Sequence, residues 1–495
     1  RRTFMANPTP ATAEPTSGAP VDDKRWLGLA VIAIAQLMVV LDASIVNIAL
    51  PSAQRDLGIS DADRQWVVTA YTLAFGGLLL LGGRIADYVG RKTTFIIGLI
   101  GFAGASALGG IAQNQEMLFA ARGLQGAFAA LLAPSALSLI TVTFVEPKER
   151  AKAFGVYGAI AGGGAALGLI LGGILTEFFS WRWCLLVNIP VAIIAVILAV
   201  PLIKQSRAEG DRRYDIPGAV TVTLGLVFMV YGFTKAEQSW TSPETLFFIG
   251  ASIVLLALFV LIEVKTSHPL LPMRVLLDRN RGGSFITSLL VGVALFGMFL
   301  FLTFYMQGTL GYSALKSGFA FLPFSAGVIL SAGLASKLLP RFGPRPVMAV
   351  GLAMGTLGMA WLTQLGVDTA YLTHVLPSEL LLSVGMGLTF VPLSSTALTG
   401  VAPHDAGVAS AMVNTTQQIG GSLGTALLNT IAASATAAFV LANGAQSIAE
   451  AQVVGYTDAF RVAAVIMAVA FIVTVTMINA KPGAGASSEV PAHVG

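Results

Sequence analysis

Long apolar runs separated by short polar segments dominate the chain. A helix needs about 20 mostly apolar residues to cross the hydrocarbon core of a bilayer. Strands of a membrane barrel would instead be short and would alternate between apolar and polar residues. The pattern therefore predicts an all-α polytopic membrane protein. Fourteen spans are expected, at residues 26–50, 65–82, 94–111, 117–140, 152–176, 184–203, 216–234, 244–263, 284–306, 317–336, 347–364, 377–399, 406–432 and 457–478.

The composition excludes most other classes of protein. Of the 495 residues, 55% are hydrophobic and 11% are charged, whereas about 25% of the residues in a typical soluble domain are charged. The formal net charge of +4 is too small to indicate a nucleic-acid partner. The one cysteine, Cys184, cannot form an intrachain disulfide. The sequence has no Walker loop, no His-Glu-x-x-His motif and no cluster of metal ligands at membrane depth, so we expect neither an enzyme nor a cofactor or metal.

The distribution of basic residues predicts how the chain lies in the membrane. With the N-terminus in the cytoplasm, 22 of the 29 Lys and Arg residues fall on the cytoplasmic side, six fall outside, and Arg122 lies within a span. This asymmetry follows the positive-inside rule and supports an even number of spans. We therefore expect a multi-pass protein of the cell membrane with both polar tails, residues 1–25 and 479–495, in the cytoplasm.

The two parts of the chain resemble each other at a nearly constant spacing. The paired features are Gly90 and Gly343, Pro134 and Pro392, and Gly164 and Gly420, which are 253, 258 and 256 residues apart. At this spacing the second span corresponds to the tenth, so the repeated unit is six helices with two further spans between the copies. The sequence therefore predicts six-helix bundles at 26–203 and 284–478. The linker 204–283 then holds the two inserted spans, which are expected to lie outside the bundles. Two such halves are typical of secondary transporters, whose substrate site lies between them.

Several motifs resemble one family. Residues 42–51 read DASIVNIALP, residues 83–92 read GRIADYVGRK, and residues 122–126 read RGLQG. Residues 181–183 (WRW) and 188–190 (NIP) are also typical of it. In these motifs the chain resembles the fourteen-span drug:proton antiporters of the major facilitator superfamily, the EmrB/QacA type, over its whole length outside the tails.

The resemblance implies a secondary active multidrug or antibiotic efflux transporter. It would exchange lipophilic, neutral or monocationic compounds for protons by alternating access, as a monomer driven by the proton gradient. Small lipophilic substrates, protons and the lipid bilayer are its expected partners. The family's antiporter motif has a proline where this chain has Leu169. A proton-coupled transporter of a specific metabolite, such as a lipid, peptide or sugar-like solute, therefore stays open as the alternative.

Asp42 and Arg122 are the candidate proton-coupling residues, because they are read as the only acid and the only base deep within a span. A charge at membrane depth is costly unless it faces a cavity or a partner. At a helix rise of 1.5 Å per residue, Asp42 lies about 12 Å and Arg122 about 8 Å from the outer surface. An ion pair between them is therefore expected. Asp42 could instead only pin the first span, and Arg122 could snorkel outward or bond backbone carbonyls.

Two further groups of residues have expected structural roles. The resemblance implies that the loop after the second span latches the halves on the cytoplasmic side through Gly83, Asp87, Gly90 and Arg91, although Arg91 could serve only to fix the topology. Small residues that recur every four positions let helices approach closely in a membrane. Glycines of the fifth span are therefore expected to pack helices or act as a hinge, namely Gly164, Gly168, Gly172 and Gly173.

A third group is expected to line the substrate cavity. Polar side chains at membrane depth cannot all face lipid, so some should face a cavity or bond across helices. The thirteenth span carries such a polar run, and other polar residues lie on the first, second and fourth spans. The predicted cavity residues are Asn47, Tyr71, Gln125, Asn414, Gln417 and Gln418.

Overall fold

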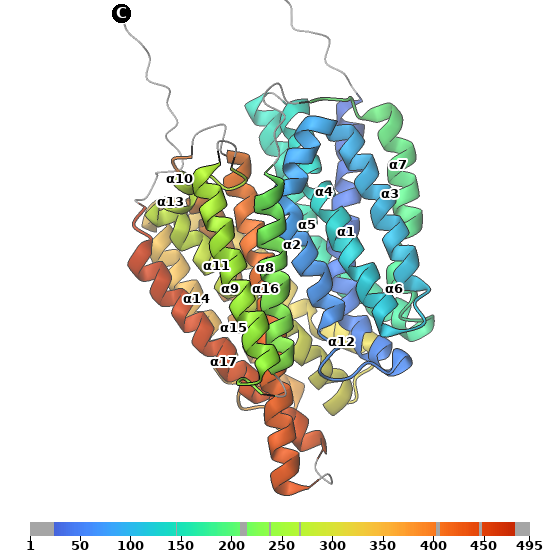
Figure 1. Cartoon of the computed structure of the whole chain (residues 1–495), viewed down its shortest axis with the longest axis vertical. Coiled ribbons are helices and arrows are strands. Elements are labelled where there is room, and N and C mark those ends of the chain that lie inside the picture. Colours follow the sequence, from blue (N-terminus) through green and yellow to red (C-terminus); the bar gives the residue numbers. More distant parts are fainter. Residues whose placement is uncertain are drawn as a thin grey trace, which may run out of the picture.

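The computed structural model of the chain describes residues 24–480, except residue 145 and the segments 208–214, 237–238, 267–268, 402–405 and 445–447. Every regular element among these residues is helical (Figure 1). The first half contains α1 (Arg25–Leu57), α2 (Trp66–Val89), α3 (Arg91–Gly110), α4 (Gln115–Thr143), α5 (Pro147–Phe178), α6 (Trp183–Leu186) and α7 (Asn188–Leu202). The middle of the chain forms α8 (Ile216–Ala236), α9 (Pro243–Lys265) and α10 (Met273–Leu276). The remainder forms α11 (Arg279–Phe304), the π-helical turn η1 (Tyr305–Thr309), α12 (Ala314–Ala320), α13 (Leu322–Phe342), α14 (Pro344–Leu362), the π-helical turn η2 (Tyr371–Val375), α15 (Leu376–Leu398), α16 (Ala406–Asn443) and α17 (Ile448–Met477).

Most of the expected spans correspond to helices that can cross a membrane. Among the described residues, 13 helices are long and apolar enough to do so. The predicted fifth span corresponds to α5, whose apolar segment Gly164–Phe178 is shorter. The protein is therefore an all-helical, multi-pass membrane protein, while the count of fourteen spans stays a prediction. The predicted cytoplasmic tails lie almost entirely outside the described residues.

Several helices extend beyond the spans predicted from the apolar runs. The first span was expected to end at residue 50, but α1 continues through Pro51 to Leu57. A proline disfavours a helical conformation in the residue before it, yet packed membrane helices tolerate it. Helix α16 likewise reaches Asn443, and α17 begins at Ile448. In Figure 1 these two helices project below the rest of the bundle.

The helices on either side of α8 and α9 pack mainly within their own part of the chain. In the first part, α2 and α3 pack on α4, and α1 packs on α5 and α7. In the second part, α11 packs on α16 and α17, and α15 packs on α13 and α14. The two parts meet where α2 contacts α16, α5 contacts α12, and α1 contacts α11. We call these parts the first and second halves; the exact domain boundaries 26–203, 204–283 and 284–478 stay predictions.

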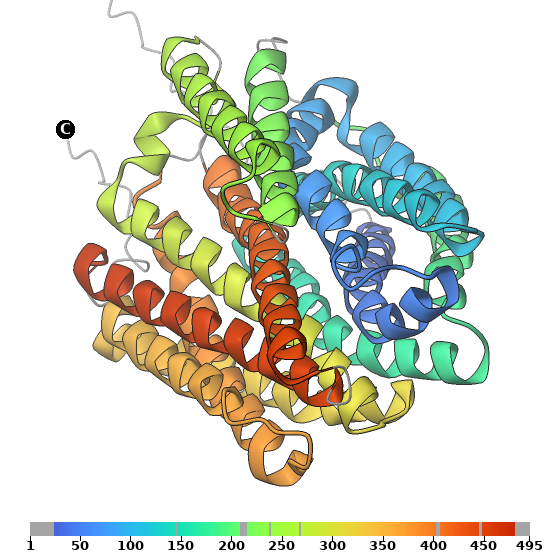
Figure 2. The same ribbon diagram turned by 60° about the horizontal axis from the view of Figure 1, so that its bottom comes forward.

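The inserted helices form a hairpin that touches both halves. Helix α8 packs on α9 and also contacts α2 and α16. Leu226 and Val230 of α8 share a small apolar cluster with Leu73 of α2 and Ala426 of α16. Figure 2 shows the hairpin in green at the edge of the bundle, beside these two helices.

Candidate functional site

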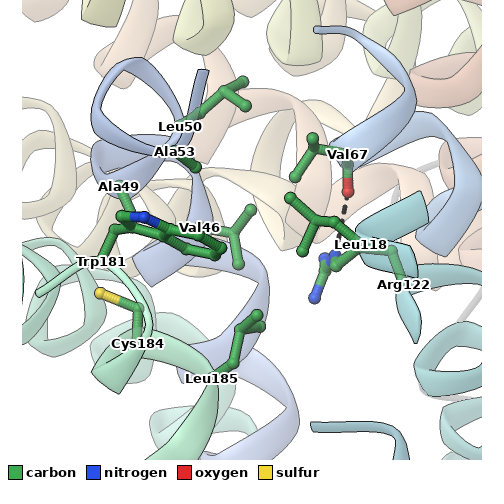
Figure 3. Close-up of a pocket in the computed structure, with 10 residues that line it drawn as sticks. All are labelled: Val46, Ala49, Leu50, Ala53, Val67, Leu118, Arg122, Trp181, Cys184 and Leu185. Carbon is green, nitrogen blue, oxygen red and sulfur yellow. Dashed lines mark hydrogen bonds between the residues drawn. The ribbon is translucent and has the colours of Figure 1, made fainter. Parts of the chain in front are cut away.

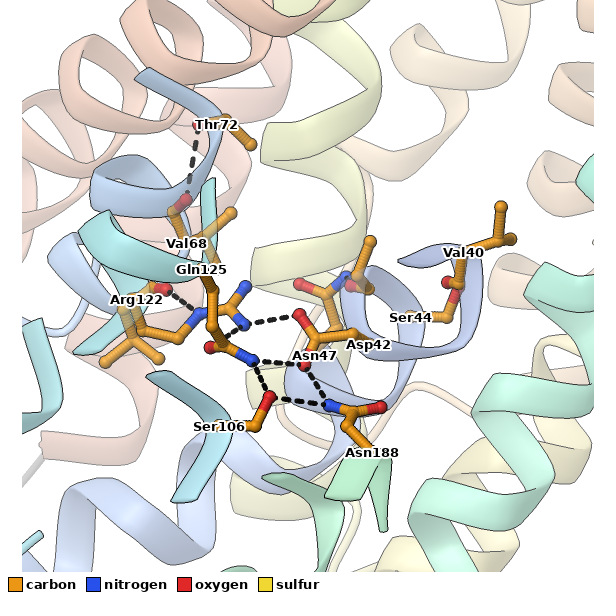
Figure 4. A network of polar contacts seen from close by, with 12 residues as sticks. Val40, Asp42, Ser44, Asn47, Val68, Thr72, Ser106, Arg122, Gln125 and Asn188 are labelled. Carbon is orange, nitrogen blue, oxygen red and sulfur yellow. Dashed lines mark hydrogen bonds and ion pairs between the residues drawn. The ribbon is translucent and has the colours of Figure 1, made fainter. Parts of the chain in front are cut away.

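A buried polar network surrounds Asp42 on α1 (Figure 4). The side chain has no exposed surface, and its carboxylate accepts three hydrogen bonds. Arg122 Nη1 of α4 donates to Oδ2 over 2.6 Å. Gln125 Nε2 of α4 and Asn188 Nδ2 of α7 donate to Oδ1 over 2.9 and 2.8 Å. Both amides also donate to Ser106 Oγ of α3, so four helices of the first half meet at this carboxylate.

Arg122 is held by more than the ion pair. Its Nε donates to the carbonyl of Val67 on α2 over 2.9 Å, and its Nη1 donates to Gln125 Oε1 over 2.8 Å. The guanidinium also lies 4.5 Å from the centre of the Tyr71 ring, a cation–π contact that strengthens where water is excluded. The ion pair expected from the depths of the two residues is therefore present. The contact to a backbone carbonyl, weighed as the alternative for Arg122, occurs as well.

The geometry makes a proton and Arg122 competitors for one carboxylate. A buried ion pair is tolerated when further hydrogen bonds satisfy its remaining donors and acceptors, and here both carboxylate oxygens are occupied. A proton on Asp42 would remove the negative charge that these three N–H groups stabilise. It would therefore weaken the charge-assisted hydrogen bonds that α4 and α7 donate to α1.

A small pocket lies beside this network (Figure 3). Its walls include Val46, Leu118, Arg122 and Trp181, and its volume is about 10 Å³. A space of this size has room for about one water molecule. It therefore offers a place for a water next to the guanidinium, and it is far too small for a drug-sized compound.

The residues predicted to line a substrate cavity lie in different environments. Gln125 and Tyr71 are buried in the Asp42 network. Asn47 is half-buried and donates to the carbonyl of Ala43 on its own helix. On α16, Asn414 is exposed, whereas Gln417 and Gln418 are half-buried. The backbone of Gln417 lies against Gly292 of α11, and Gln418 lies against Gly76 of α2. Gln417 and Gln418 thus lie at helix crossings, and the crossing of α16 with α2 joins the halves.

The predicted latch is described only in part, because the side chain of Asp87 lies outside the described residues. Gly90 has a φ of 114°, a conformation that favours glycine. The N–H of Arg91 donates to the carbonyl of Ser206, and Gly83 lies in ordinary contact with Pro134. These contacts stay within the first half and its following linker. Arg84, in the same motif, donates to the carbonyl of Pro269 in the segment between α9 and α10.

The glycines of α5 serve close helix packing. Added Cβ atoms at Gly164, Gly168 and Gly172 would lie 3.0, 2.7 and 3.0 Å from atoms of α1. At Gly173 an added Cβ would lie 2.6 Å from Leu315 Cα of α12, in the second half. The packing expected from their four-residue spacing is therefore present, and the last glycine extends it across the interface between the halves. A hinge at these positions stays a prediction.

Sequence reasoning missed several charged and polar residues that the fold buries. Asn188 had been noted only as part of a motif, and Ser106 not at all. Asp42 is not the only acid buried within a span, because Glu379 on α15 has no exposed surface. It was overlooked because it lies close to the predicted start of its span, where an acid is expected to reach water. Arg64, assigned to an outer loop, is also buried, at 4% exposure.

Arg64, in the loop between α1 and α2, joins the two halves. It forms an ion pair with Asp61, and its Nε donates to Asn429 Oδ1 of α16 over 3.3 Å. The guanidinium lies 3.9 Å from the centre of the Phe304 ring at the end of α11. Asn429 Nδ2 in turn donates to the carbonyl of Asp61 over 3.0 Å. We call these four residues, Asp61, Arg64, Phe304 and Asn429, the Arg64 clamp.

The helices are long enough to cross a membrane, and they pack as two halves, one of which contains a buried ion pair. These features are typical of a polytopic membrane protein of the transporter class. A sequence profile of the Major Facilitator Superfamily matches residues 32–425. The chain belongs to this superfamily and is a membrane transporter.

Relatives with assigned roles are antibiotic resistance and export proteins. The chain is 49% identical over 482 residues to the puromycin resistance protein pur8 of Streptomyces alboniger, covering 95% of this chain and 96% of that protein. It is 41% identical over 408 residues to the cephamycin export protein CmcT of Amycolatopsis lactamdurans, and this match covers 81% of this chain and 84% of that protein. Among solved structures, a bacterial homolog of the human lysosomal transporter Spinster, inward-facing and unoccupied, has a TM-score of 0.65. It is 16% identical, and the match covers 93% of this chain and 98% of that one, which concerns the fold alone.

Proposed function

We propose that this transporter is a drug efflux pump of the fourteen-span EmrB/QacA type. It exchanges lipophilic, neutral or monocationic compounds for protons across the cell membrane, with both termini in the cytoplasm. It works as a monomer of two six-helix bundles with the α8–α9 hairpin inserted, and the proton gradient drives it without a cofactor. The relatives that are named for resistance or export support efflux. The observation that carries the proton-coupled mechanism is the buried Asp42–Arg122 pair.

Protonation of Asp42 reaches the interface between the halves through α1. Asp42 and Ile48 lie on the same helix, and Gln307 Nε2 of η1 donates to the carbonyl of Ile48 over 3.0 Å. Neutralising Asp42 weakens the charge-assisted hydrogen bonds that hold α1 to α4 and α7, and this changes the fit of α1 against the second half. Coupling of the two then requires only that the proton and the cargo bind most tightly to different arrangements of the halves. A reciprocal coupling of about 1–3 kcal/mol is typical of such linkage.

Binding of the cargo is coupled to binding of the proton, although the cargo does not contact Asp42 in this conformation. The carboxylate is fully buried inside the first half, and the pocket beside it holds about one water. We place the cargo path along α1 and α16, near Asn47, Asn414 and Gln417. The end of α2 and the start of α3 act as the cytoplasmic latch through Gly83, Asp87, Gly90 and Arg91.

A transporter of one specific metabolite is the second candidate, because Leu169 replaces the proline of the family's antiporter motif. A drug-susceptibility panel separates the two proposals. A strain that overexpresses the chain should tolerate several unrelated lipophilic antibiotics, and a deletion strain should become sensitive to the same compounds. Unchanged susceptibility to all of them, together with loss of one metabolite from the medium of the deletion strain, would establish the alternative.

A further inference from the structure

A second buried carboxylate lies in the second half, and the mechanism above does not use it. Glu379 lies in the first turn of α15 and has no exposed surface. Its Oε1 has no hydrogen-bond partner in the part of the chain that the structure describes. The ion pairs found among the same residues do not include it. Asp42, by contrast, is surrounded by three donors.

The second oxygen of Glu379 faces a hydroxyl group that is already engaged. Tyr371 Oη lies 2.7 Å from the carbonyl oxygen of Ala320 and 3.3 Å from Glu379 Oε2. A phenol has one hydrogen to donate, and the carbonyl, which has none, takes it in the shorter contact. The longer contact then joins two oxygens that need a hydrogen between them. A proton on Glu379 supplies that hydrogen and turns the contact into a donation to Tyr371.

Among the residues that the structure describes, no cation is placed to balance a charge on Glu379. The charged residues of α11, α13 and α14 lie at the far ends of these helices, at Arg279, Arg281, Lys337, Arg341 and Arg345. Helix α16 carries no charged residue. On the near side, Lys316 Nζ lies over the ring of Tyr312, whose centre is 6.3 Å from that of Tyr371. His374 shares a hydrogen bond with Thr373. An unpaired charge within a membrane span is costly.

We propose that Glu379 is a second proton-binding site of the transporter, protonated in this conformation. Tyr371 lies on the π-helical turn η2 next to a groove of about 610 Å³. Thr369, Thr373, His374 and Glu450 line this groove, which gives water access to the same turn. The turn η2 thus carries both Thr373 and His374, which line the groove, and Tyr371, whose hydroxyl group contacts Glu379. Proton binding stands on this geometry alone, whereas its use in transport rests on the proposed function.

The competing explanation is that Glu379 remains charged. An acid in the first turn of a helix is stabilised by the helix dipole, typically by about 0.3–1 kcal/mol. A carboxylate held in this way would be ionised across the working pH range. A protonated and a charged Glu379 differ in their vibrational spectra, because only the acid has a carboxylic C=O stretch.

The test is pH-difference infrared spectroscopy on the full chain in lipid nanodiscs. We expect a carboxylic C=O band in the wild type that is lost in Glu379→Gln and kept in Asp42→Asn. Glu116→Gln, at an exposed acid of α4, is the matched control and should keep the band. Tyr371→Phe removes the acceptor, so the band should shift and disappear at a lower pH. An unchanged spectrum in Glu379→Gln and Tyr371→Phe would overturn the proposal in favour of a helix-terminal charge.

A transport measurement separates this proposal from the proposed function. In proteoliposomes with an imposed pH gradient, Glu379→Gln should lower the number of protons moved per cargo, while exchange of labelled for unlabelled cargo without a gradient persists. If the wild type moves no protons with its cargo but shows the Glu379 band, antiport fails and the proton site stands. If antiport is normal in both proteins and the band is absent, the second site fails alone.

Discussion

Three N–H donors surround the carboxylate of Asp42 inside the first half. Asn at this position keeps the size of the side chain but cannot bind a proton in the same pH range. We expect Asp42→Asn to abolish proton-driven efflux while neutral cargo still binds, and Asp42→Glu to retain part of the activity. The measurement is cargo movement in proteoliposomes with an imposed pH gradient, and Glu116→Gln, at an exposed acid of α4, is the control. Continued uphill transport by Asp42→Asn would show that the coupling site lies elsewhere.

Removal of Arg122 leaves the carboxylate of Asp42 buried without its cation. Breaking a buried pair from one side typically costs about 3–5 kcal/mol, so Arg122→Gln should lower the Tm. The pH optimum of transport should move upward, because the guanidinium no longer competes with a proton for the carboxylate. The double variant with Asp42→Asn has no uncompensated charge and should recover part of the lost Tm. A double variant no more stable than Arg122→Gln would mean that the two side chains are not energetically coupled.

Sequence reasoning reached the Asp42–Arg122 pair because two intramembrane charges of opposite sign at comparable depth usually form a pair. It could not reach Asn188 or Ser106, because the rotation of α7 and α3 about their own axes decides which side chains meet Asp42. Hydropathy carries no information on that rotation. Glu379 and Arg64 were missed for a related reason. Charges near span ends are expected to reach water, and only tertiary packing excludes water from these two.

Helix α5 is held against α1 by glycines rather than by interlocking side chains. At Gly168, an added Cβ would lie 2.7 Å from Ser44 Cβ and 3.1 Å from the carbonyl oxygen of Leu41. Overpacking of this kind typically costs about 1–3 kcal/mol. Gly168→Ala should therefore lower the Tm and slow transport, whereas Gly104→Ala, where an added Cβ meets nothing within 4 Å, should do neither. Equal effects of both variants would show that helix propensity, not packing, decides.

The existence of the helices could be predicted far better than their ends. An apolar run marks the part of a helix that lies in the hydrocarbon core of the bilayer. Each expected span contains helix in the structure. The helix itself continues as long as its backbone hydrogen bonds are favourable, so α16 runs through an alanine-rich stretch beyond the predicted end at residue 432. The break between α6 and α7 in the predicted span 184–203 was not foreseen, because both pieces are apolar.

At the scale of the whole molecule, the halves are joined most visibly at the end that carries the Arg64 clamp. Besides the clamp, the N–H of Leu315 donates to Glu177 Oε2 over 3.0 Å, and Gly318 lies against the carbonyl of Leu169. The distribution of basic residues predicts that this end faces the outside. With that predicted orientation, the interface corresponds to an arrangement in which the outer end is closed. The contacts named here must then break before that end can open.

Arg64 contributes a hydrogen bond to Asn429 and a cation–π contact with Phe304 to this closure, while its ion pair with Asp61 stays within the first half. A buried cation–π contact can contribute about 2 kcal/mol, and a shift of 1.4 kcal/mol changes a population ratio tenfold. We therefore expect Arg64→Ala to move the population about tenfold or more toward the state with the outer end open. Spin labels on Arg55→Cys and Glu450→Cys, both exposed at this end, should report longer distances in a Cys184→Ser background. If the predicted latch closes the cytoplasmic end, Asp87→Asn should open that end and shorten the distances between the two labels. An unchanged distance distribution in Arg64→Ala would mean that the glycine contacts between α5 and α12 close this end without the clamp.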